Sequence, residues 1–473
     1  MSASTPRRRV VDNEGHEHVY PTTSAIEQVN LLNPGGVSNK GLQAGKVGLL
    51  GAVVIGVSVV APAYTLTSGL GPTISTVGTH VPAILLLGFI PMLLVALGYR
   101  ALNTRVPDSG TSFTWATHAF GPYVGWMGGW GLIAASVIVL SNLAAVAVDF
   151  TFLLLAQITG SQAIADLAGN LWVNIPLTLV YLALAGWISH RGMETTKHLQ
   201  YILVAFQILA LGAFAVAALT QSSRGAGFDP TPVQLDWFNP FTAGDFSVVA
   251  AGVSLSIFLF WGWDVTLTMN EETKDPERTP GRAAAVTVFV IIAVYILSAL
   301  AVISWAGIGS EGLGAGNPDN QESIFAVLAG PILGPFAVIM SSAILVSSLA
   351  SLQSTMVSPA RTLLAMGFYR AVPARFAELS PRFNSPAFAT WVCAGFAGLF
   401  YVVTRLLSEN ALWDTITALG MMICFYYGLT AFACVWYFRK QWFDSVRDVF
   451  FTFLFPLIGG VILAVLFVTT LID

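Results

Sequence analysis

The residues best suited to chemistry lie in one interrupted apolar segment, 251–282, which reads AGVSLSIFLFWGWDVTLTMNEETKDPERTPGR. Its middle holds Gly262 and an acid, Asp264, and its end is a dense cluster of charges and prolines. A carboxylate inside a bilayer is costly and normally faces a protein-lined cavity. Glycine lets the backbone leave helical geometry, which membranes tolerate only where the freed groups line a site. The pattern predicts a helix that breaks near the membrane midplane to build a binding site.

A second interruption lies in the first apolar span, 47–71. Gly56 and Ser58 precede Pro62, whose ring removes one backbone hydrogen bond and weakens the preceding turn. We expect the backbone to open here, because the amide end of a half-helix carries partial positive charge and suits a carboxylate. Close helix packing is the alternative for such small residues. The interruption at Gly262 lies in the sixth span, and breaks in the first and sixth spans are typical of two five-helix halves with inverted topology. This correspondence favours a binding site over helix packing.

The elements that position these residues are membrane helices. The chain is 55% hydrophobic and only 10% charged, and its mean hydropathy is +0.73, which excludes an ordinary soluble protein. A spanning helix needs about 20 mostly apolar residues. The sequence therefore predicts an all-α polytopic membrane protein with eleven spans, at 47–71, 81–102, 122–157, 171–189, 197–220, 246–270, 282–307, 333–367, 386–407, 411–437 and 447–471.

Basic residues predict the orientation of these spans. With the N-terminus in the cytoplasm, all of the 21 Lys and Arg except Arg224 and Arg405 fall on the cytoplasmic side, as the positive-inside rule requires. No secretory signal is apparent after Arg7–Arg9. We expect a mobile cytoplasmic tail at 1–46, a ten-helix core at 47–437 and a peripheral helix at 438–473. The three cysteines, Cys393, Cys424 and Cys434, lie in apolar segments and are predicted to be buried core residues.

Three blocks of sequence resemble the amino acid–polyamine–organocation (APC) superfamily of permeases. They occur in the order and spacing of that family and together cover about 45–440. The blocks are VPDSG at 106–110 with FGPYVGW at 120–126; FLFWGWD at 258–264 followed by EETKDPERTPGRA at 271–283; and SPARTLLAMG at 358–367 with SPA at 385–387. The resemblance implies a LeuT-like fold with 5+5 inverted repeats, in which the unwound parts of helices one and six hold the substrate.

The resemblance also implies a set of substrate-binding residues. The backbone amides of Gly56, Val57 and Ser58 would meet a carboxylate, and carbonyls at Phe258 and Trp261, in the break with Leu259 and Gly262, would lie near an ammonium group. Phe258 matches an aromatic gate over the substrate, although packing or contact with lipid is the ordinary role of membrane aromatics. Ser141 and Asn142 match positions that contact the substrate side chain, with hydrogen bonding between helices as the alternative.

Ion coupling is less constrained. Asp264 matches an acidic position linked to proton sensitivity in relatives, with a hydrogen-bonded structural acid as the alternative. Where sodium-independent relatives often carry a lysine, this chain has the neutral Gln207, so H⁺ and Na⁺ both stay open. Ser347, Ser348 and Ser351 offer hydroxyls near that position, unless they bond to their own helix. The chain departs from the family pattern in two further ways. It has Gly56-Val57-Ser58 where many relatives have Gly-Ser-Gly, and it has eleven predicted spans where family members usually have twelve.

Charged residues at the cytoplasmic end predict a gate. Glu271, Glu272, Lys274 and Arg278 could form an ion-pair latch, with Arg361 as a partner for one of the acids. Alternating access needs such latches to break and reform, whereas static charge clusters are the commoner case.

These observations predict a secondary transporter that moves amino acids across the cytoplasmic membrane as a symporter or exchanger. A carrier of polyamines or other organic cations with the same fold is the alternative. A membrane-embedded enzyme is disfavoured because the sequence has no HExxH pair, Gly-x-Ser-x-Gly elbow or P-loop. A channel is disfavoured because a pore does not need two broken helices. We expect a small-molecule substrate and the lipid bilayer as partners, with no cofactor, metal or nucleic acid. The oligomeric state stays open.

Overall fold

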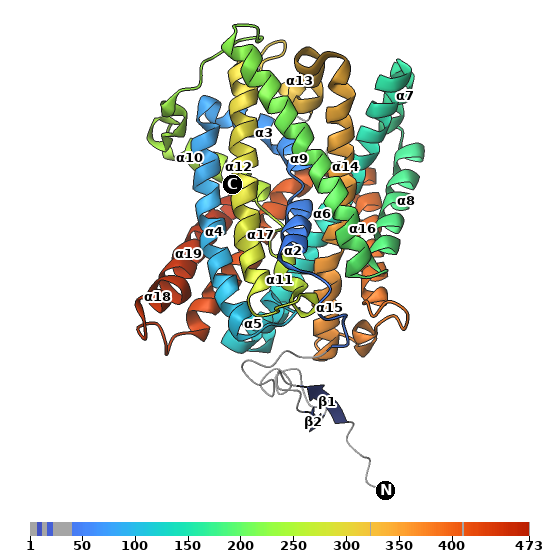
Figure 1. Cartoon of the computed structure of the whole chain (residues 1–473), viewed down its shortest axis with the longest axis vertical. Helices are drawn as coiled ribbons and strands as arrows, with labels where there is room; N and C mark the ends of the chain where they lie inside the picture. The colour runs from blue at the N-terminus through green and yellow to red at the C-terminus, as the bar shows by residue number, and fades with distance from the viewer. Residues whose placement is uncertain (1–6, 12–16, 22–39, 322, 409–410, 473) are drawn as a thin grey trace.

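The computed structural model describes residues 7–11, 17–21, 40–321, 323–408 and 411–472. Figure 1 shows a bundle of long helices packed side by side. The only strands in the described residues are β1 (Arg7–Val11) and β2 (Glu17–Pro21), which pair antiparallel in the N-terminal segment. The rest of the regular structure is helical, which confirms the all-α prediction.

Most of the main helices of the bundle follow the predicted spans, whereas two short helices, at 112–120 and 324–333, lie almost wholly outside them. The main helices are α2 (Leu49–Val60), α3 (Pro62–Val77), α4 (Val81–Arg105), α5 (Ser112–Phe120), α6 (Pro122–Thr159), α8 (Leu171–Ser189), α9 (Met193–Ser223), α10 (Phe246–Leu259), α11 (Val265–Thr268), α12 (Thr279–Ala306), α13 (Ile324–Leu333), α14 (Ala337–Thr355), α15 (Val357–Phe368), α16 (Ala387–Leu407), α17 (Ala411–Tyr437) and α19 (Phe455–Ile472).

Nine helical stretches in the described residues are long and apolar enough to cross a membrane, against eleven predicted spans. One of the nine, Leu49–Arg105, contains two predicted spans, because the turn between α3 and α4 is itself helical at Gly78–His80. The sixth predicted span appears as the short apolar α10, since its second half is broken. The exact number of spans therefore stays a prediction.

The first span breaks at Ala61, between α2 and α3. Ala61 has φ 54° and ψ 63°, the left-handed conformation that side chains other than glycine adopt only at a cost. Pro62 starts α3 and has no N–H, so the carbonyl of Ser58 loses its helical donor. The prediction placed the break at Gly56–Ser58 and is wrong by a few residues, because a proline ends a helix at the preceding residue.

The small residues before the break serve helix packing. A Cβ added to Gly56 would lie 2.6 Å from Oγ1 of Thr287 on α12 and 3.0 Å from Cγ2 of Thr266 on α11. The alternative considered for this glycine, close contact between helices, therefore holds.

The sixth span breaks over five residues, 260–264, between α10 and α11. Gly262 has φ +107°, and a Cβ added to it would lie 2.5 Å from Cγ1 of Val59 on α2. Both the backbone conformation and the lack of space require glycine here. The predicted break at Gly262 is confirmed, and it presses directly against the end of α2.

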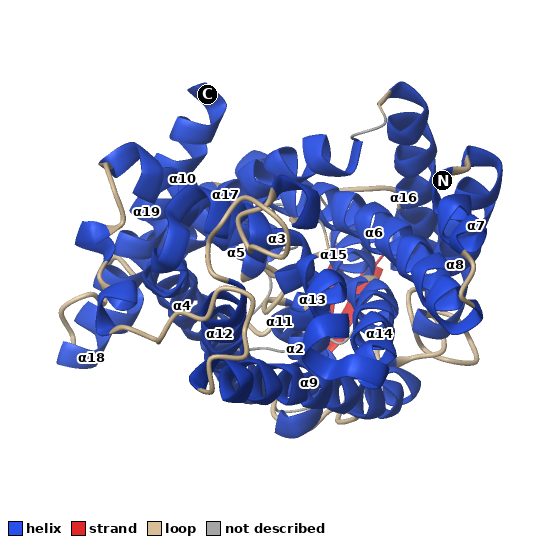
Figure 2. Cartoon of the chain, turned by 90° about the horizontal axis from the view of Figure 1, so that it is seen from above, coloured by secondary structure: helices blue, strands red, loops and turns tan. Residues whose placement is uncertain are grey.

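The two broken helices lie inside the bundle. Figure 2 shows α2, α3 and α11 in the middle of the view, with α8 and α16 on one side and α18 (Val446–Asp448) and α19 on the other. α2 packs against α9, α12 and α14, and α3 packs against α10 and α14. α19 packs on α4 and α17, outside these contacts. All three cysteines are buried and free, as predicted.

Candidate functional site

The end of α2 presents carbonyl groups that side chains from other elements bind. The hydroxyl of Ser351 on α14 donates to the carbonyl of Val59 at 2.8 Å, and the hydroxyl of Thr65 donates to the carbonyl of Val60 at 2.5 Å. The carbonyl of Ser58 lacks its helical donor, because Pro62 has no N–H. This end of the half-helix carries partial negative charge and suits a cation.

The beginning of α3 presents amides instead. The amide of Tyr64 donates to the hydroxyl of Ser347 at 3.3 Å, and no side chain caps the helix. The amide of Ala63 belongs to the first turn of α3, where amides have no acceptor within their own helix. The first turn of this 16-residue helix therefore carries uncompensated positive charge, which suits a carboxylate. The amides available are those of Ala63 and Tyr64, whereas Gly56, Val57 and Ser58 lie within helix α2.

The second break supplies further carbonyl groups. The carbonyl of Phe258 accepts from the amide of Trp261 at 3.1 Å, and that of Leu259 accepts from the hydroxyl of Tyr295 at 2.5 Å. The carbonyls of Phe260 and Trp261 accept no hydrogen bond from the described part of the chain. Of the two carbonyls assigned to an ammonium group, that of Trp261 is free to accept, whereas that of Phe258 is used within the turn.

Asp264 lies at the end of this break and binds two tyrosines of α17. The hydroxyl of Tyr427 donates to Oδ1 of Asp264 at 2.8 Å, and that of Tyr426 donates to Oδ2 at 3.3 Å. Tyr426 also accepts from Nε1 of Trp261 at 2.7 Å. The amide of Gly262 donates to the hydroxyl of Tyr427 at 3.3 Å. The buried carboxylate therefore joins the broken helix to α17, and no sequence pattern indicated the two tyrosines.

Two residues of α6 predicted to contact substrate have different environments. Ser141 donates to the carbonyl of Val137 on its own helix at 2.9 Å and to that of Ala397 on α16 at 2.8 Å, so it joins two helices. Asn142 accepts from Thr415 of α17 at 3.2 Å, but its buried Nδ2 has no partner among the described residues. Asn142 therefore keeps an unused donor, whereas Ser141 is fully engaged.

Some of the residues predicted for ion coupling bind groups near the first break, whereas one bonds only its own helix. Ser351 binds the end of α2, as described above. Ser347 donates to Oε1 of Gln207 on α9 at 2.5 Å, and Nε2 of Gln207 has no partner in the described residues. Ser348 donates to the carbonyl of Ile344, one turn back on its own helix, at 2.9 Å. Ser348 therefore takes the alternative role considered for it, while Gln207 and Ser347 bridge α9 and α14 near the first break.

A second polar network next to Ser351 was not predicted. Gln200 of α9 accepts from Ser58 at 2.6 Å, and its Nε2 donates to Oε1 of Gln353 on α14 at 2.7 Å and to the carbonyl of Ala350 at 3.0 Å. Gln200 and Gln353 are buried. The network holds α2, α9 and α14 together at the depth of the first break. No group of three or more His, Cys, Asp or Glu able to hold a metal ion is found in the described ranges.

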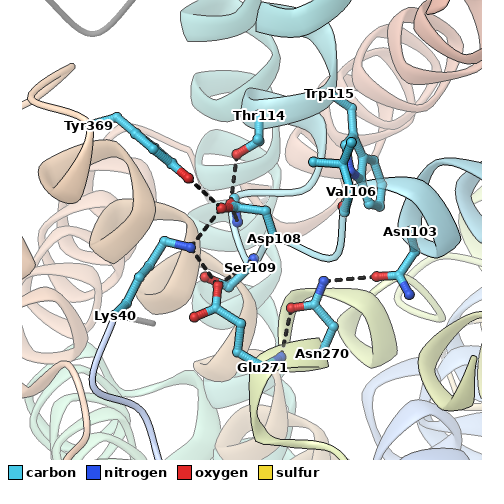
Figure 3. Close-up of polar contacts among 11 residues, drawn as sticks. Lys40, Asn103, Val106, Asp108, Ser109, Thr114, Trp115, Asn270, Glu271 and Tyr369 are labelled. Carbon is cyan, nitrogen blue, oxygen red and sulfur yellow. Dashed lines mark hydrogen bonds and ion pairs between the residues drawn. The ribbon is translucent and has the colours of Figure 1, made fainter. Parts of the chain in front are cut away.

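At the end of the bundle near the N-terminal segment lies a cluster of buried charges. Figure 3 shows Nζ of Lys40 between two carboxylates, at 2.7 Å from Oδ2 of Asp108 and 2.5 Å from Oε1 of Glu271. The hydroxyl of Tyr369 donates to Asp108 at 2.7 Å, and Oγ1 of Thr114 donates to its other oxygen at 2.7 Å. None of the Lys40 side chain is exposed. The predicted mobile tail therefore does not include Lys40, which is part of the core.

The pKa values of this cluster show which groups carry charge. Burial opposes the charge on Lys40, but the two carboxylates outweigh burial and raise its pKa above the ordinary value. Burial also opposes ionisation of Asp108, yet the Lys40 charge and the hydroxyls of Tyr369 and Thr114 bring its pKa below the ordinary range. Burial raises the pKa of Glu271, and the Lys40 charge offsets this only in part. Lys40 and Asp108 therefore form the ion pair, with Glu271 as the more readily neutralised member.

A second buried ion pair and a backbone bridge complete this end. Arg361 of α15 donates to both oxygens of Glu272, from Nε at 2.8 Å and from Nη2 at 3.2 Å. Val47 pairs with Thr273 as an isolated parallel bridge, which joins the segment before α2 to the segment after α11. Lys274 and Arg278, predicted members of the latch, form no ion pair among the described residues.

Sequence reasoning missed Lys40 and Asp108, although a signal was present. The distribution of basic residues places the segment before the first span and the loop after the second on the same side of the membrane. A lysine in the first and an acid in the second, VPDSG, could have been paired on that ground.

Three comparisons relate this architecture to known proteins. The profile of the amino acid permease family matches residues 47–473. The low-affinity putrescine importer PlaP of Escherichia coli K12 is 24% identical over 463 residues, which cover 95% of this chain and 91% of PlaP. The branched-chain amino acid permease BcaP of Lactococcus lactis is 24% identical over 63% of each chain. The crystal structure of MhsT in complex with L-phenylalanine superposes with a TM-score of 0.62 at 17% identity, over 88% of this chain and 98% of MhsT.

Proposed function

Because the chain belongs to the amino acid permease family, we propose that it binds an amino acid between its two broken helices and carries it across the membrane by alternating access. The protein is a multi-pass membrane transporter with a LeuT-like fold. Its relatives are transporters, so the family points away from an enzyme. The substrate is a small molecule.

The contact between the two breaks carries this proposal. Gly262 approaches Val59 so closely that no Cβ fits, which brings the two helices into contact at their breaks. The amides that begin α3 suit a carboxylate, and the carbonyls of Phe260 and Trp261 suit an ammonium group. An α-amino acid carries both groups on its α-carbon, and Asn142 keeps a buried donor that suits the substrate side chain.

A polyamine is the second candidate, and one observation favours it. Asp264 is a buried acid in the second break, and a carboxylate there suits an additional substrate ammonium group. PlaP, whose name describes it as a putrescine importer, is similar to this chain over almost its whole length. A polyamine has no carboxylate, however, and would leave the beginning of α3 without a counter-charge.

Thermal-shift screening of the purified protein distinguishes the two substrates. The common amino acids, putrescine and spermidine are tested singly at equal concentration. We expect the largest rise in Tm with an amino acid, because a ligand that binds only the folded state stabilises it. A response to polyamines alone would overturn the amino-acid proposal, and uptake of the labelled hit into proteoliposomes then confirms transport.

The coupling ion is part of the same proposal. Asp264 supports coupling to H⁺, and the carbonyls at the end of α2 with the hydroxyl of Ser351 support Na⁺. Uptake into proteoliposomes with choline in place of sodium, at fixed pH and without a membrane potential, separates them. Loss of uptake in choline assigns Na⁺, and retained uptake that follows an imposed pH gradient assigns H⁺.

We also propose that the protein lies in the cytoplasmic membrane with its N-terminus inside, because the basic residues gather on that side. Arg224 and Arg382 are both exposed and are assigned to opposite sides. A membrane-impermeant maleimide added to intact cells should label Arg224→Cys and not Arg382→Cys. The reverse pattern would invert the topology.

A further inference from the structure

A basic pocket lies outside the transport site, at the same end of the bundle as the Lys40 cluster. It has a volume of about 320 Å³ and lies between the end of α4, the residue that follows α17, and the segment formed by α18 and the π-helix Val449–Leu454. Figure 1 shows α18 beside the lower end of α4, near α5. The pocket therefore separates the transporter core from the peripheral C-terminal helix.

The pocket carries a concentration of positive charge. Arg100, Arg105 and Arg447 line it, and the charges of Arg282 and Arg447 act on Arg100. Arg100 also packs against Gly281 at the beginning of α12, where an added Cβ would lie 2.5 Å from its Cγ. Three arginines thus line the opening, and a fourth, Arg282, lies close enough for its charge to act on one of them.

Within the described part of the chain, no carboxylate pairs with these arginines. Arg100, Arg105, Arg282 and Arg447 form no ion pair with an acid among the described residues. The one acid that lines the pocket, Asp448, accepts from the hydroxyl of Ser445 at 2.6 Å in the cap of α18. Like charges held together without a counter-ion repel one another, so an anion that enters the pocket gains from several of them at once.

Apolar side chains make up much of the remaining lining. Leu97, Phe438 and Phe451 form the apolar part of the pocket. Next to it, the side chains of Phe443 and Val446 are 79% and 76% exposed. Apolar exposure beside arginines is typical of the membrane interface, where phospholipid headgroups lie.

We propose that this pocket binds a phosphate group supplied by the headgroup of an anionic phospholipid. Guanidinium groups bind phosphate oxygens in pairs of hydrogen bonds, and the exposed apolar residues contact the acyl chains. Inorganic phosphate has the same charged group but no acyl chain, so the apolar lining favours the lipid.

The bound headgroup would lie next to the connection between α11 and α12. Asn103 donates to the carbonyl of Pro276 at 2.7 Å, and the pocket residue Thr104 donates to that of Glu277 at 3.2 Å. The lipid therefore holds α4, α12 and the C-terminal helix together beside the segment that follows the second break.

Lipid binding to the full-length protein tests this proposal directly. Native mass spectrometry counts bound phosphatidylglycerol on the unmodified chain, on the pocket variant Arg100→Gln/Arg447→Gln and on the control Arg439→Gln. Arg439 is exposed and lies beside this region, where it stacks on Trp436 outside the pocket. We expect about thirty-fold weaker binding in the pocket variant, that is about 1 kcal/mol for each arginine converted at 1.4 kcal/mol per tenfold, and unchanged binding in the control.

Two further measurements keep the proposal falsifiable. The single variant Arg447→Gln changes only an exposed side chain, so we expect it to fold even if the double variant does not. Its affinity for phosphatidylglycerol should fall about five-fold. Phosphatidylcholine and inorganic phosphate are tested at the same concentrations by the rise in Tm. Equal phosphatidylglycerol binding in all variants would overturn the site, and equal stabilisation by inorganic phosphate would overturn the lipid as its source.

Discussion

Lys40 connects separate parts of the chain at one end of the helix bundle. Its side chain has no exposed surface, and it contacts two carboxylates that come from different parts of the chain. Removing one partner of a buried ion pair leaves an uncompensated charge, which costs far more than the pair itself contributes. Three charges in this cluster sum to −1 when all are ionised, so the two acids are not equivalent.

Asp108 and Glu271 should therefore respond differently to neutralisation. Asp108→Asn removes the carboxylate whose pKa is lowered and should destabilise the protein by about 3–5 kcal/mol. Glu271→Gln removes the carboxylate whose pKa burial raises and should cost only about 1 kcal/mol, because the Lys40–Asp108 pair remains. Thermal unfolding of both variants measures the difference. Equal losses would contradict the assignment of the charge to Asp108.

Asp264 should govern the pH dependence of transport. Asp264→Asn keeps the shape of the side chain but cannot change protonation, so uptake in proteoliposomes should lose most of its dependence on pH. Tyr427→Phe removes only the 2.8 Å hydrogen bond to the carboxylate, and its uptake should stay pH-dependent with a displaced profile. An unchanged profile in Asp264→Asn would assign the acid a purely structural role.

Residue types alone predicted part of this site. Asp264 and Gly262 stand out because an acid and a glycine interrupt an apolar run, and the structure places both in the second break. Ser141 and Ser348 could not be told apart from ligand-binding serines, because a hydroxyl that bonds a carbonyl one turn back leaves no mark in the sequence. Tyr426 and Tyr427 approach Asp264 only through the packing of α17, which no local pattern encodes.

At the scale of elements, the two breaks have different causes. The first follows from Pro62, which leaves Ser58 without a helical donor and places Ala61 in the left-handed conformation. The second follows from Gly262, which alone tolerates both a positive φ and the contact with Val59. The sequence predicted that both helices break. The first break was predicted at the small residues Gly56 and Ser58, although Pro62 causes it.

Gly262→Ala should damage the protein through this element. The added methyl group meets Val59 at 2.5 Å and strains a backbone with φ +107°, so we expect a loss of about 1–3 kcal/mol from strain alone and a loss of uptake. Gly212→Ala is the matched control, because Gly212 lies inside α9 with nothing within 4 Å of an added Cβ. The control should keep its uptake and gain up to about 1 kcal/mol in stability from helix propensity. Normal uptake by Gly262→Ala would contradict a strained, functional break.

At the scale of the whole molecule, one end of the transport path is closed. The Lys40 cluster, the Glu272–Arg361 pair and the Val47–Thr273 bridge lie at that end and are all buried or paired. Opening this end requires the segment before α2 to separate from the segment after α11, because the bridge joins them directly. Composition predicted the bundle and its helices, whereas this closure depends on contacts between residues that lie 68 to 231 positions apart in the chain.

Locking the bridge should therefore stop transport while leaving binding intact. Partners in a β-bridge lie within the Cα distance that a disulfide spans, so Val47→Cys/Thr273→Cys should form one on oxidation. We expect the oxidised double variant to lose uptake in proteoliposomes and to recover it after reduction, with the substrate still raising Tm in both states. The single variants Val47→Cys and Thr273→Cys are the controls, since the three native cysteines are buried. Full uptake by the cross-linked protein would mean that α2 and the segment after α11 move together, and alternating access would then have to open this end elsewhere.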